Sequence, residues 1–222
     1  MIDLHSHVLY GVDDGARDKN ESIAMLKAAR KCGFRVLYAT PHYRAMWKNT
    51  NAAKKAFFDL KPEAAHLGIK LCRGAELYTG SFDRDMLNWY LVELAYDSSR
   101  CILFELKTSS LVSDEEERIY LLQRAGMDVL IAHPERYTEI QRSKQAMRRY
   151  FDIGCRLLIS ADDLLLPFWR IRRITAERIL NSGFPVCIAS DAHSADDYLR
   201  LRELLKKRPD LKRCFQGVEF DH

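Results

Sequence analysis

The chain opens with residues 1–15, MIDLHSHVLYGVDDG, a stretch dense in residue types that bind metals. A short apolar run leads into His5 and His7, and Asp13 and Asp14 follow six residues later. Residues 1–7 have the composition of a strand, and residues two apart on a strand point to the same side. His5 and His7 can therefore face one common space, so the stretch is either a polar loop or the first part of a metal site.

The bulk composition is typical of a soluble globular protein, with 47% hydrophobic and 30% charged residues among 222. The net charge of +4 is too small to indicate nucleic-acid or membrane binding. The N-terminus lacks the basic flank and apolar stretch of a signal peptide, and no apolar run approaches the length of a membrane span. The sequence therefore predicts a cytoplasmic protein that is not inserted into a membrane.

The cysteines do not form a recognisable motif. All six occur singly, several of them inside apolar runs, which predicts buried thiols in a reducing compartment rather than disulfides. None is followed six residues later by arginine, as the phosphate-binding loop of cysteine phosphatases requires, and no Gly-x-Ser-x-Gly turn occurs. For a hydrolase, these absences leave water activated by a metal as the nucleophile.

Short β-rich runs alternate with helical patterns along the chain. The predicted strands are residues 1–7, 35–42, 70–77, 100–107, 127–137, 155–160 and 185–193. The predicted helices are residues 20–34, 49–69, 81–95, 113–126, 142–154, 172–183 and 196–210. We expect Asn20 to open the first helix, Gly33 to close it, and Pro62 to break or restart the second.

Seven such βα repeats without a flexible linker predict one parallel-sheet domain over residues 1–222. No glycine-rich phosphate loop follows any predicted strand. A closed or nearly closed barrel therefore fits better than an open doubly wound sheet.

Five of the seven histidines fall where a predicted strand ends: His5, His7, His42, His133 and His193. Three acids fall in equivalent places: Glu76, Glu105 and Asp191. Functional residues of parallel barrels gather at the carboxyl ends of the strands, so these eight residues are expected to converge.

One histidine at a strand end is more often structural than a ligand, but several carboxylates in one pocket repel one another unless a cation lies among them. Nitrogen and oxygen ligands without thiolate favour Mn, Fe or Zn over Ca. The set is too large for one ion, which predicts a cluster.

Five sequence blocks carry a family resemblance: MIDLHSHVLYGVDDGARDKNES, ATPHY, GAELY, AHPERY and IASDAHS. In order and spacing the chain resembles the polymerase-and-histidinol-phosphatase (PHP) superfamily, and within it the CpsB/CapC/YwqE-type bacterial tyrosine-protein phosphatases. The resemblance implies a distorted seven-stranded (β/α)7 TIM-like barrel, the PHP fold. It also implies a three-metal cluster supported by Mn2+, with Fe, Zn, Co or Mg as alternatives.

The resemblance also implies roles for individual residues. The first metal would be held by His5, His7, Glu76 and Asp191. The second would share Glu76 and add Glu105 and His133. The third would take Asp14, His42 and His193, with Asp13 as the alternative to Asp14. Arg136 matches a phosphate-contacting arginine of the family. Apart from the resemblance, the chemistry of a phenolate leaving group calls for modest protonation, which a pocket acid or histidine such as Asp191 or His193 could provide.

One family position differs in this chain. Tyr198 stands where the family commonly has a second arginine, and Arg200 or Arg202 are the alternatives. Tyr43 and Trp47 either flank a substrate ring or pack within their loop. The basic stretches RSKQAMRRY, RIRR and LRLRELLKKRPDLKR are predicted to be mainly solvated helix faces, some of which could line the mouth of the site.

The function implied by the resemblance is hydrolysis of phosphotyrosine. The expected substrate is the tyrosine-rich tail of a bacterial kinase that controls capsular or exopolysaccharide biosynthesis. Two alternatives remain open, a small-molecule phosphomonoesterase such as a histidinol phosphatase and a catalytically weak metal-binding regulator. A homo-oligomer is compatible with each of these functions.

Overall fold

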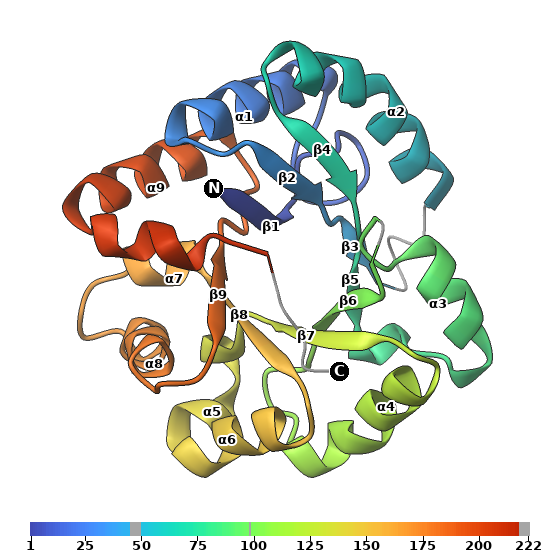
Figure 1. The fold of residues 1–222 in the computed structure, drawn as a ribbon, viewed down its shortest axis with the longest axis vertical. Helices are drawn as coiled ribbons and strands as arrows, with labels where there is room; N and C mark the ends of the chain where they lie inside the picture. Colours follow the sequence, from blue (N-terminus) through green and yellow to red (C-terminus); the bar gives the residue numbers. More distant parts are fainter. Residues whose placement is uncertain (45–49, 98, 218–222) are drawn as a thin grey trace.

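A computed structural model of the chain describes residues 1–44, 50–97 and 99–217, and in it strands and helices alternate along the sequence (Figure 1). The strands are β1 (Ile2–Ser6), β2 (Val36–Ala39), β3 (His42–Tyr43), β4 (Lys70–Arg73), β5 (Glu76–Tyr78), β6 (Cys101–Glu105), β7 (Asp128–Ala132), β8 (Arg156–Ser160) and β9 (Val186–Ala189). The α-helices are α1 (Lys19–Cys32), α2 (Thr50–His66), α3 (Leu87–Glu93), α4 (Val112–Arg124), α5 (Thr138–Arg142), α6 (Lys144–Asp152), α7 (Ala161–Leu165), α8 (Ile171–Leu180) and α9 (Ala195–Lys207). Short 3₁₀ turns cover Thr79–Ser81, Arg84–Met86, Pro134–Arg136 and Pro209–Cys214.

The strands pair in parallel throughout, in two sheets with the orders β1-β2-β4 and β3-β5-β6-β7-β8-β9. Two of the predicted strands are each broken in two, residues 35–42 into β2 and β3 and residues 70–77 into β4 and β5. The first break contains Pro41, which has no N–H to donate to a sheet. Backbone hydrogen bonds still cross the breaks, since Thr40 N donates to Ser6 O at 2.9 Å and Gly74 N donates to Ala39 O at 3.0 Å.

Figure 1 shows the strands arranged around a common axis with the helices outside them. The first and last strands, β1 and β9, lie next to each other at the point where one isolated β-bridge joins Ser6 of β1 to Ala192, which follows β9. His7 N also donates to Ala192 O at 2.9 Å. The α/β class and the parallel pairing are therefore confirmed. The prediction of a single closed seven-stranded barrel is not confirmed, because the strands of the described residues pair as two sheets.

The strands of the larger sheet are buried on both faces. Ile102 and Phe104 of β6 belong to the outer core that packs under the helices, whereas Leu103 belongs to an inner cluster between the strands. Tyr96 extends into this inner cluster and donates its hydroxyl to Leu4 O at 2.6 Å, which satisfies a buried polar group. Burial on both faces explains the almost continuous apolar runs of the sequence.

The helix ends only partly follow the prediction. The cap of α1 is Asp18, whose carboxylate accepts from Glu21 N at 3.0 Å, rather than Asn20, while Gly33 closes the helix as expected. Pro62 does not break α2. The proline is exposed, and Leu60 on the opposite face is fully buried, so packing keeps the helix continuous despite the missing N–H.

The described cysteines are all free thiols, and only Cys214 is not buried. Burial raises the pKa of Cys155 to about 12, so this sulfur is not available as a thiolate at neutral pH. No helix in the described part of the chain combines the length and apolarity that crossing a bilayer requires.

Candidate metal centre

The nine residues that the resemblance implies as ligands lie together in the structure. They come from β1 and the loop after it (His5, His7, Asp14), from the first residues of β3 and β5 (His42, Glu76), from the end of β6 (Glu105), and from the residues that follow β7 and β9 (His133, Asp191, His193). The register of β3 on β5 pairs His42 directly with Glu76. The parallel strands thus bring residues as distant in sequence as His5 and His193 to one edge, as expected.

His5 and His7 each have one ring nitrogen fixed and the other directed into the cluster. Nδ1 of His5 is hydrogen-bonded to Thr40 Oγ1 at 2.7 Å, and Nδ1 of His7 donates to Asp13 Oδ2 at 2.8 Å. The Nε2 atoms lie 3.2 and 3.5 Å from Asp191 Oδ1. Neither Nε2 has a hydrogen-bond partner among the residues that the structure describes, although both rings are buried.

This arrangement fits a divalent cation. Histidines that bind metals usually donate their other ring N–H to an outer partner, which fixes the tautomer and the ring orientation. A buried ring nitrogen without a hydrogen bond destabilises the folded protein. A cation placed among these nitrogens and carboxylates would remove this cost by accepting the lone pair of the nitrogen.

A second group of ligand-type atoms lies nearer to solvent. It contains four ligand atoms, each a ring nitrogen or carboxylate oxygen, that all lie within 4.8 Å of one another; they belong to His7, Asp14, His42 and His193. Asp14 Oδ1 is 3.4 Å from His42 Nε2 and 3.5 Å from His193 Nε2. His193 Nδ1 donates to the backbone oxygen of Asp191 at 2.9 Å, so Nε2 is the ring nitrogen that faces the cluster.

The structure separates the roles of the two adjacent acids. Asp14 faces the cluster, whereas the carboxylate of Asp13 is buried and accepts from three N–H groups: His7 Nδ1, Gly15 N at 3.0 Å and His42 N at 3.0 Å. Gly15 is needed for this turn, because a Cβ there would lie 2.1 Å from His7 O. Asp13 therefore orients histidines, and Asp14 is the acid placed to bind an ion.

Glu76 lies at the centre of the histidines. Its Oε1 is 2.8 Å from His133 Nε2, and its Oε2 is 2.5 Å from His42 Nδ1. Burial alone would raise the pKa of Glu76, but the charge of His5 and the hydrogen bonds from His133 and His42 outweigh burial and hold the pKa well below its usual range. A carboxylate that stays ionised at the centre of several nitrogens is suited to bridge two cations.

Glu105 and Arg44 form a pair that sequence reasoning missed. Arg44 Nη2 lies 2.6 and 2.7 Å from the two carboxylate oxygens of Glu105, and Nε lies 3.1 Å from Oε2. Burial raises the pKa of Glu105 and the charge of Glu76 adds to this, while Arg44 opposes both. The signal available in the sequence was a basic residue two positions after a predicted ligand, His42, but its partner is 61 residues away.

Arg136 lies at the edge of the cluster and is held by acids. Its Nη2 donates to Asp191 Oδ2 at 2.7 Å and to Ser160 Oγ at 3.2 Å, and its Nε donates to Asp163 Oδ2 at 2.8 Å. Asp163 is fully buried and was not predicted as a site residue. These contacts fix the guanidinium beside a predicted ligand.

Two residues of the cluster have left-handed backbones. His133 has φ 32° and Asp191 has φ 52°, and no other non-glycine residue in the described ranges has positive φ. Such conformations cost about 1–3 kcal/mol each and concentrate at functional sites. The strain therefore coincides with the residues that the sequence singles out.

Comparison with known proteins agrees with this geometry. Residues 1–220 match the family described as "Capsular polysaccharide synthesis, CpsB/CapC". The chain belongs to this family.

Two relatives and one solved structure show the extent of the similarity. The chain is 30% identical over 200 residues to the tyrosine-protein phosphatase YwqE of Bacillus subtilis (strain 168), which covers 87% of this chain and 78% of the relative. It is 29% identical over 225 residues to the putative tyrosine-protein phosphatase CapC of Staphylococcus aureus, covering 99% and 87%. A crystal structure from work on YwqE of Bacillus subtilis and CpsB of Streptococcus pneumoniae, described as unique metal-dependent tyrosine phosphatases, matches with a TM-score of 0.75 and 25% identity. That match covers 100% of this chain and 97% of the other.

This member of the CpsB/CapC family does not bring the alternative arginines to the site. Tyr198 is fully buried and donates its hydroxyl to Asp3 Oδ2 at 2.8 Å, so its position belongs to the core. Arg200 pairs with Asp197 on the exposed side of α9. Arg202 is also exposed. Neither residue contacts the cluster in the described part of the chain.

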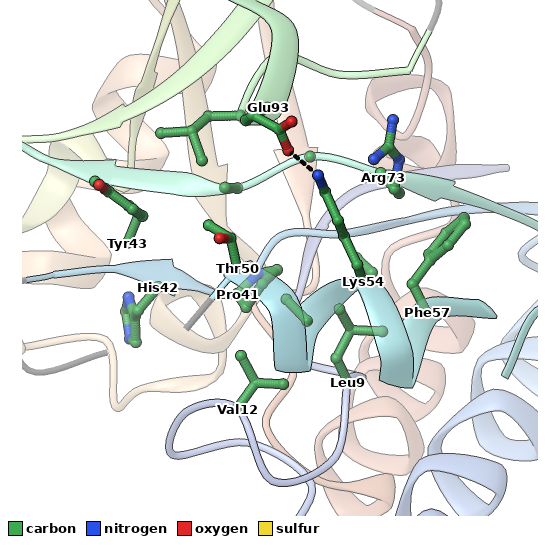
Figure 2. Close-up of a pocket in the computed structure, with 15 residues that line it drawn as sticks. Leu9, Val12, Pro41, His42, Tyr43, Thr50, Lys54, Phe57, Arg73 and Glu93 are labelled. Atoms are coloured by element: carbon green, nitrogen blue, oxygen red, sulfur yellow. Dashed lines mark ion pairs between the residues drawn. The ribbon is translucent and has the colours of Figure 1, made fainter. Parts of the chain in front are cut away.

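An apolar cavity lies behind His42, between α2 and the broken strands (Figure 2). Its volume is about 40 Å³, and the ion pair between Lys54 Nζ and Glu93 Oε2, 2.6 Å long, crosses it. That volume suits a water molecule or two and not a phosphotyrosine side chain. Tyr43 is buried and lines this cavity, so it packs within the protein, and Trp47 lies outside the described residues.

Proposed function

We propose that this chain is a metal-dependent protein-tyrosine phosphatase. The observation that carries the proposal is the convergence of five histidines and four acids on one edge of the sheets, with Arg136 held beside them. Family membership and the names of the relatives agree with this activity.

The ligand assignment is part of the proposal. His5, His7, Glu76 and Asp191 would hold one cation, Glu76, Glu105 and His133 a second, and Asp14, His42 and His193 a third. Mixed imidazole and carboxylate donors without thiolate suit Mn2+, which we propose as the ion, while Fe, Zn, Co and Mg are also compatible with these donors. Arg44 would have to leave Glu105 when the second position is filled.

Divalent cations bound in such a site supply Lewis acidity and a water that is nucleophilic near neutral pH. The residues of the chain do the rest. Glu76 and Asp191 stay ionised because surrounding positive charges outweigh the effect of burial and keep their pKa values well below the usual range. Both carboxylates are therefore negatively charged near pH 7 and can hold cations in fixed positions.

Arg136 is proposed to bind the phosphoryl oxygens. Its guanidinium is a preorganised donor that needs no rearrangement as charge develops in the transition state. Asp163 and Asp191 hold two of its nitrogens in place. The phenolate leaving group has a pKa near 10, so it needs only modest help to depart.

Neither predicted proton donor is well suited to that task. Asp191 is buried beside Arg136, and its lowered pKa keeps it ionised. His193 uses Nδ1 for the backbone of Asp191 and directs Nε2 at the proposed third ion, so the ring has no nitrogen left for the substrate. We assign both residues to cation binding and leave protonation of the phenolate to solvent.

We propose as substrate the phosphorylated, tyrosine-rich tail of a kinase of polysaccharide export, in line with the description of the family. We propose that residues 1–222 act as one unit in which the two sheets form a single distorted seven-stranded barrel. The bridge between Ser6 and Ala192 supports this closure. A cytoplasmic location is also proposed, because buried free thiols are typical of reducing compartments.

The test uses the metal-stripped protein with and without added Mn2+, assayed on a phosphotyrosine peptide, on para-nitrophenyl phosphate and on histidinol phosphate. We expect hydrolysis of the peptide only with metal, and at least about 100-fold loss in Glu76→Gln. Faster turnover of histidinol phosphate would support the small-molecule phosphatase instead. A protein that binds Mn2+ but cleaves none of the three would be a regulator.

A further inference from the structure

Residues 166–174, with the sequence LPFWRIRRI, connect α7 to α8 and form the first turn of α8; they are here called the rim segment. It holds four of the nine large apolar side chains that are exposed in the described part of the chain. Phe168 is 75% and Trp169 66% exposed, and their rings meet edge to face with centroids 5.0 Å apart. Ile171 and Ile174, in the first turn of α8, are also exposed, at 50% and 46%. Contiguous exposed apolar surface of this kind typically marks a binding site.

The rim segment is joined to the metal centre by a series of short ion pairs. Arg172 Nε lies 2.9 Å from Asp163 Oδ1, and the other oxygen of Asp163 binds Arg136 Nε at 2.8 Å. Arg136 in turn lies 2.7 Å from Asp191. Because Asp163 is fully buried, it fixes the two arginines relative to each other. The patch is therefore held at the side of the site where Arg136 would bind a phosphoryl group.

The charge of the rim segment favours an acidic ligand. It contains three arginines and no acid, and Arg170 and Arg172 have exposed or partly exposed side chains. The alternative surface is a groove of about 420 Å³ beside Asp14 and His193. Two further acids, Glu21 and Asp196, line it together with one base, Arg17, which pairs with Glu21. Acids outnumber bases among the side chains of that groove, whereas the charged side chains of the rim segment are all bases, so charge favours the rim segment for an acidic peptide.

We propose that the rim segment binds the polypeptide that flanks the phosphotyrosine, with Phe168 and Trp169 contacting its apolar and aromatic side chains and the arginines its acids. This inference rests on the proposed phosphatase function and adds the determinant of substrate choice. Aromatic residues and arginine dominate the energetics of protein interfaces. Arg136 and Arg172 contact the same carboxylate, that of Asp163, and about five extended residues of a bound peptide would span roughly 17 Å along this side of the site.

The experiment compares steady-state kinetics of the Mn2+-loaded wild type with the double variant Phe168→Ser/Trp169→Ser. Two substrates are used: free phosphotyrosine, and a peptide with phosphotyrosine flanked on each side by six residues rich in tyrosine and glutamate. We expect KM for the peptide to rise about five- to tenfold, as truncation of interface aromatics typically costs. For free phosphotyrosine kcat/KM should stay within about twofold.

A matched control is Phe58→Ser/Val92→Ser, which removes two apolar side chains of similar exposure, 62% and 70%, from α2 and α3. It should leave both substrates unchanged. An unchanged peptide KM in the rim variant would overturn the proposal, and so would an equal loss on both substrates, since that would mean damage to the metal centre.

Two further measurements keep the test decisive. Anisotropy of the labelled peptide with EDTA-treated protein measures binding without turnover, and weaker binding by the rim variant than by wild type is expected. If the wild type binds the peptide but never cleaves it, the phosphatase proposal fails while the rim proposal stands. Sedimentation velocity tests the other occupant: a wild-type dimer that the rim substitutions dissociate, with peptide KM unchanged, would assign the patch to a second copy of the chain.

Discussion

Asp13 offers a test of the metal centre that removes none of the proposed ligands. In Asp13→Asn the side chain keeps its shape and loses its charge. The carboxylate accepts from His7 Nδ1 at 2.8 Å and from the backbone N–H groups of Gly15 and His42, both at 3.0 Å. An amide has one acceptor oxygen instead of two, so its NH2 group must face at least one of these donors.

The size of the effect follows from the pKa. Burial alone would raise the pKa of Asp13, but the hydrogen bond and charge of His7 and the two backbone donors lower it from 3.8 to about 2. This lowering of the pKa corresponds to roughly 2–3 kcal/mol that favours the ionised carboxylate in the folded protein. For a chain of this length that energy lowers the Tm by about 5–10 °C. Loss of the outer partner of His7 should weaken Mn2+ binding by about 10–100-fold.

The effect has a defined pH dependence. Since the pKa is lower in the folded protein, the contribution of ionised Asp13 is fully present above pH 3.8 and is lost as the pH falls from 3.8 toward 2. Thermal unfolding of the metal-stripped wild type and Asp13→Asn is measured between pH 3 and 6. The difference in Tm between the two proteins should be constant above pH 5 and should become smaller below pH 4.

Asp14→Asn is the matched control, because the side chain of Asp14 is 51% exposed and faces the proposed ion. It should lose Mn2+ affinity by calorimetry while its stability without metal changes by less than about 0.5 kcal/mol. Equal stability of wild type and Asp13→Asn, or a difference in Tm that does not depend on pH, would refute the reasoning.

Further predictions concern charge in the same site. Arg44→Ala should destabilise the metal-stripped protein by about 1–2 kcal/mol, because Glu105 loses its partner, and added Mn2+ should recover most of this in thermal melts. Arg136→Lys, which cannot span Asp163 and Asp191 at once, should lower kcat/KM for phosphotyrosine peptide by about 10–100-fold, and rates equal to wild type would contradict its role. The hydrogen bond and charge of Asp13, together with the nearby carboxylates of Asp191 and Glu76, outweigh burial and raise the pKa of His7, so Mn2+ must displace its proton. Calorimetry should therefore show tighter Mn2+ binding and less proton release as pH rises from 6 to 8.

The order of strands and helices could be predicted from the sequence because it depends on local patterns, apolar runs of strand length and helical periodicity between them. The strand-end histidines and acids could be predicted for the same reason, since parallel strands bring their carboxyl ends to one edge. Contacts between distant residues left no such signal. Arg44 meets Glu105 across 61 residues, and Tyr198 meets Asp3 across 195, so neither partner could be read from its neighbours.

The breaks in two strands show what a local pattern cannot supply. Each break comes directly before a proposed ligand: Pro41 precedes His42, and Gly74 lies two residues before Glu76. A Cβ at Gly74 would lie 2.4 Å from the ring of Tyr96, so this turn depends on an aromatic side chain that extends from another part of the chain into the inner cluster. If residues 35–42 and 70–77 each formed one continuous strand, their side chains would alternate between the two faces of the sheet along the whole length of the strand. The breaks start new short strands whose register places His42 beside Glu76, so the same irregularity that leaves two sheets instead of one assembles the centre of the site.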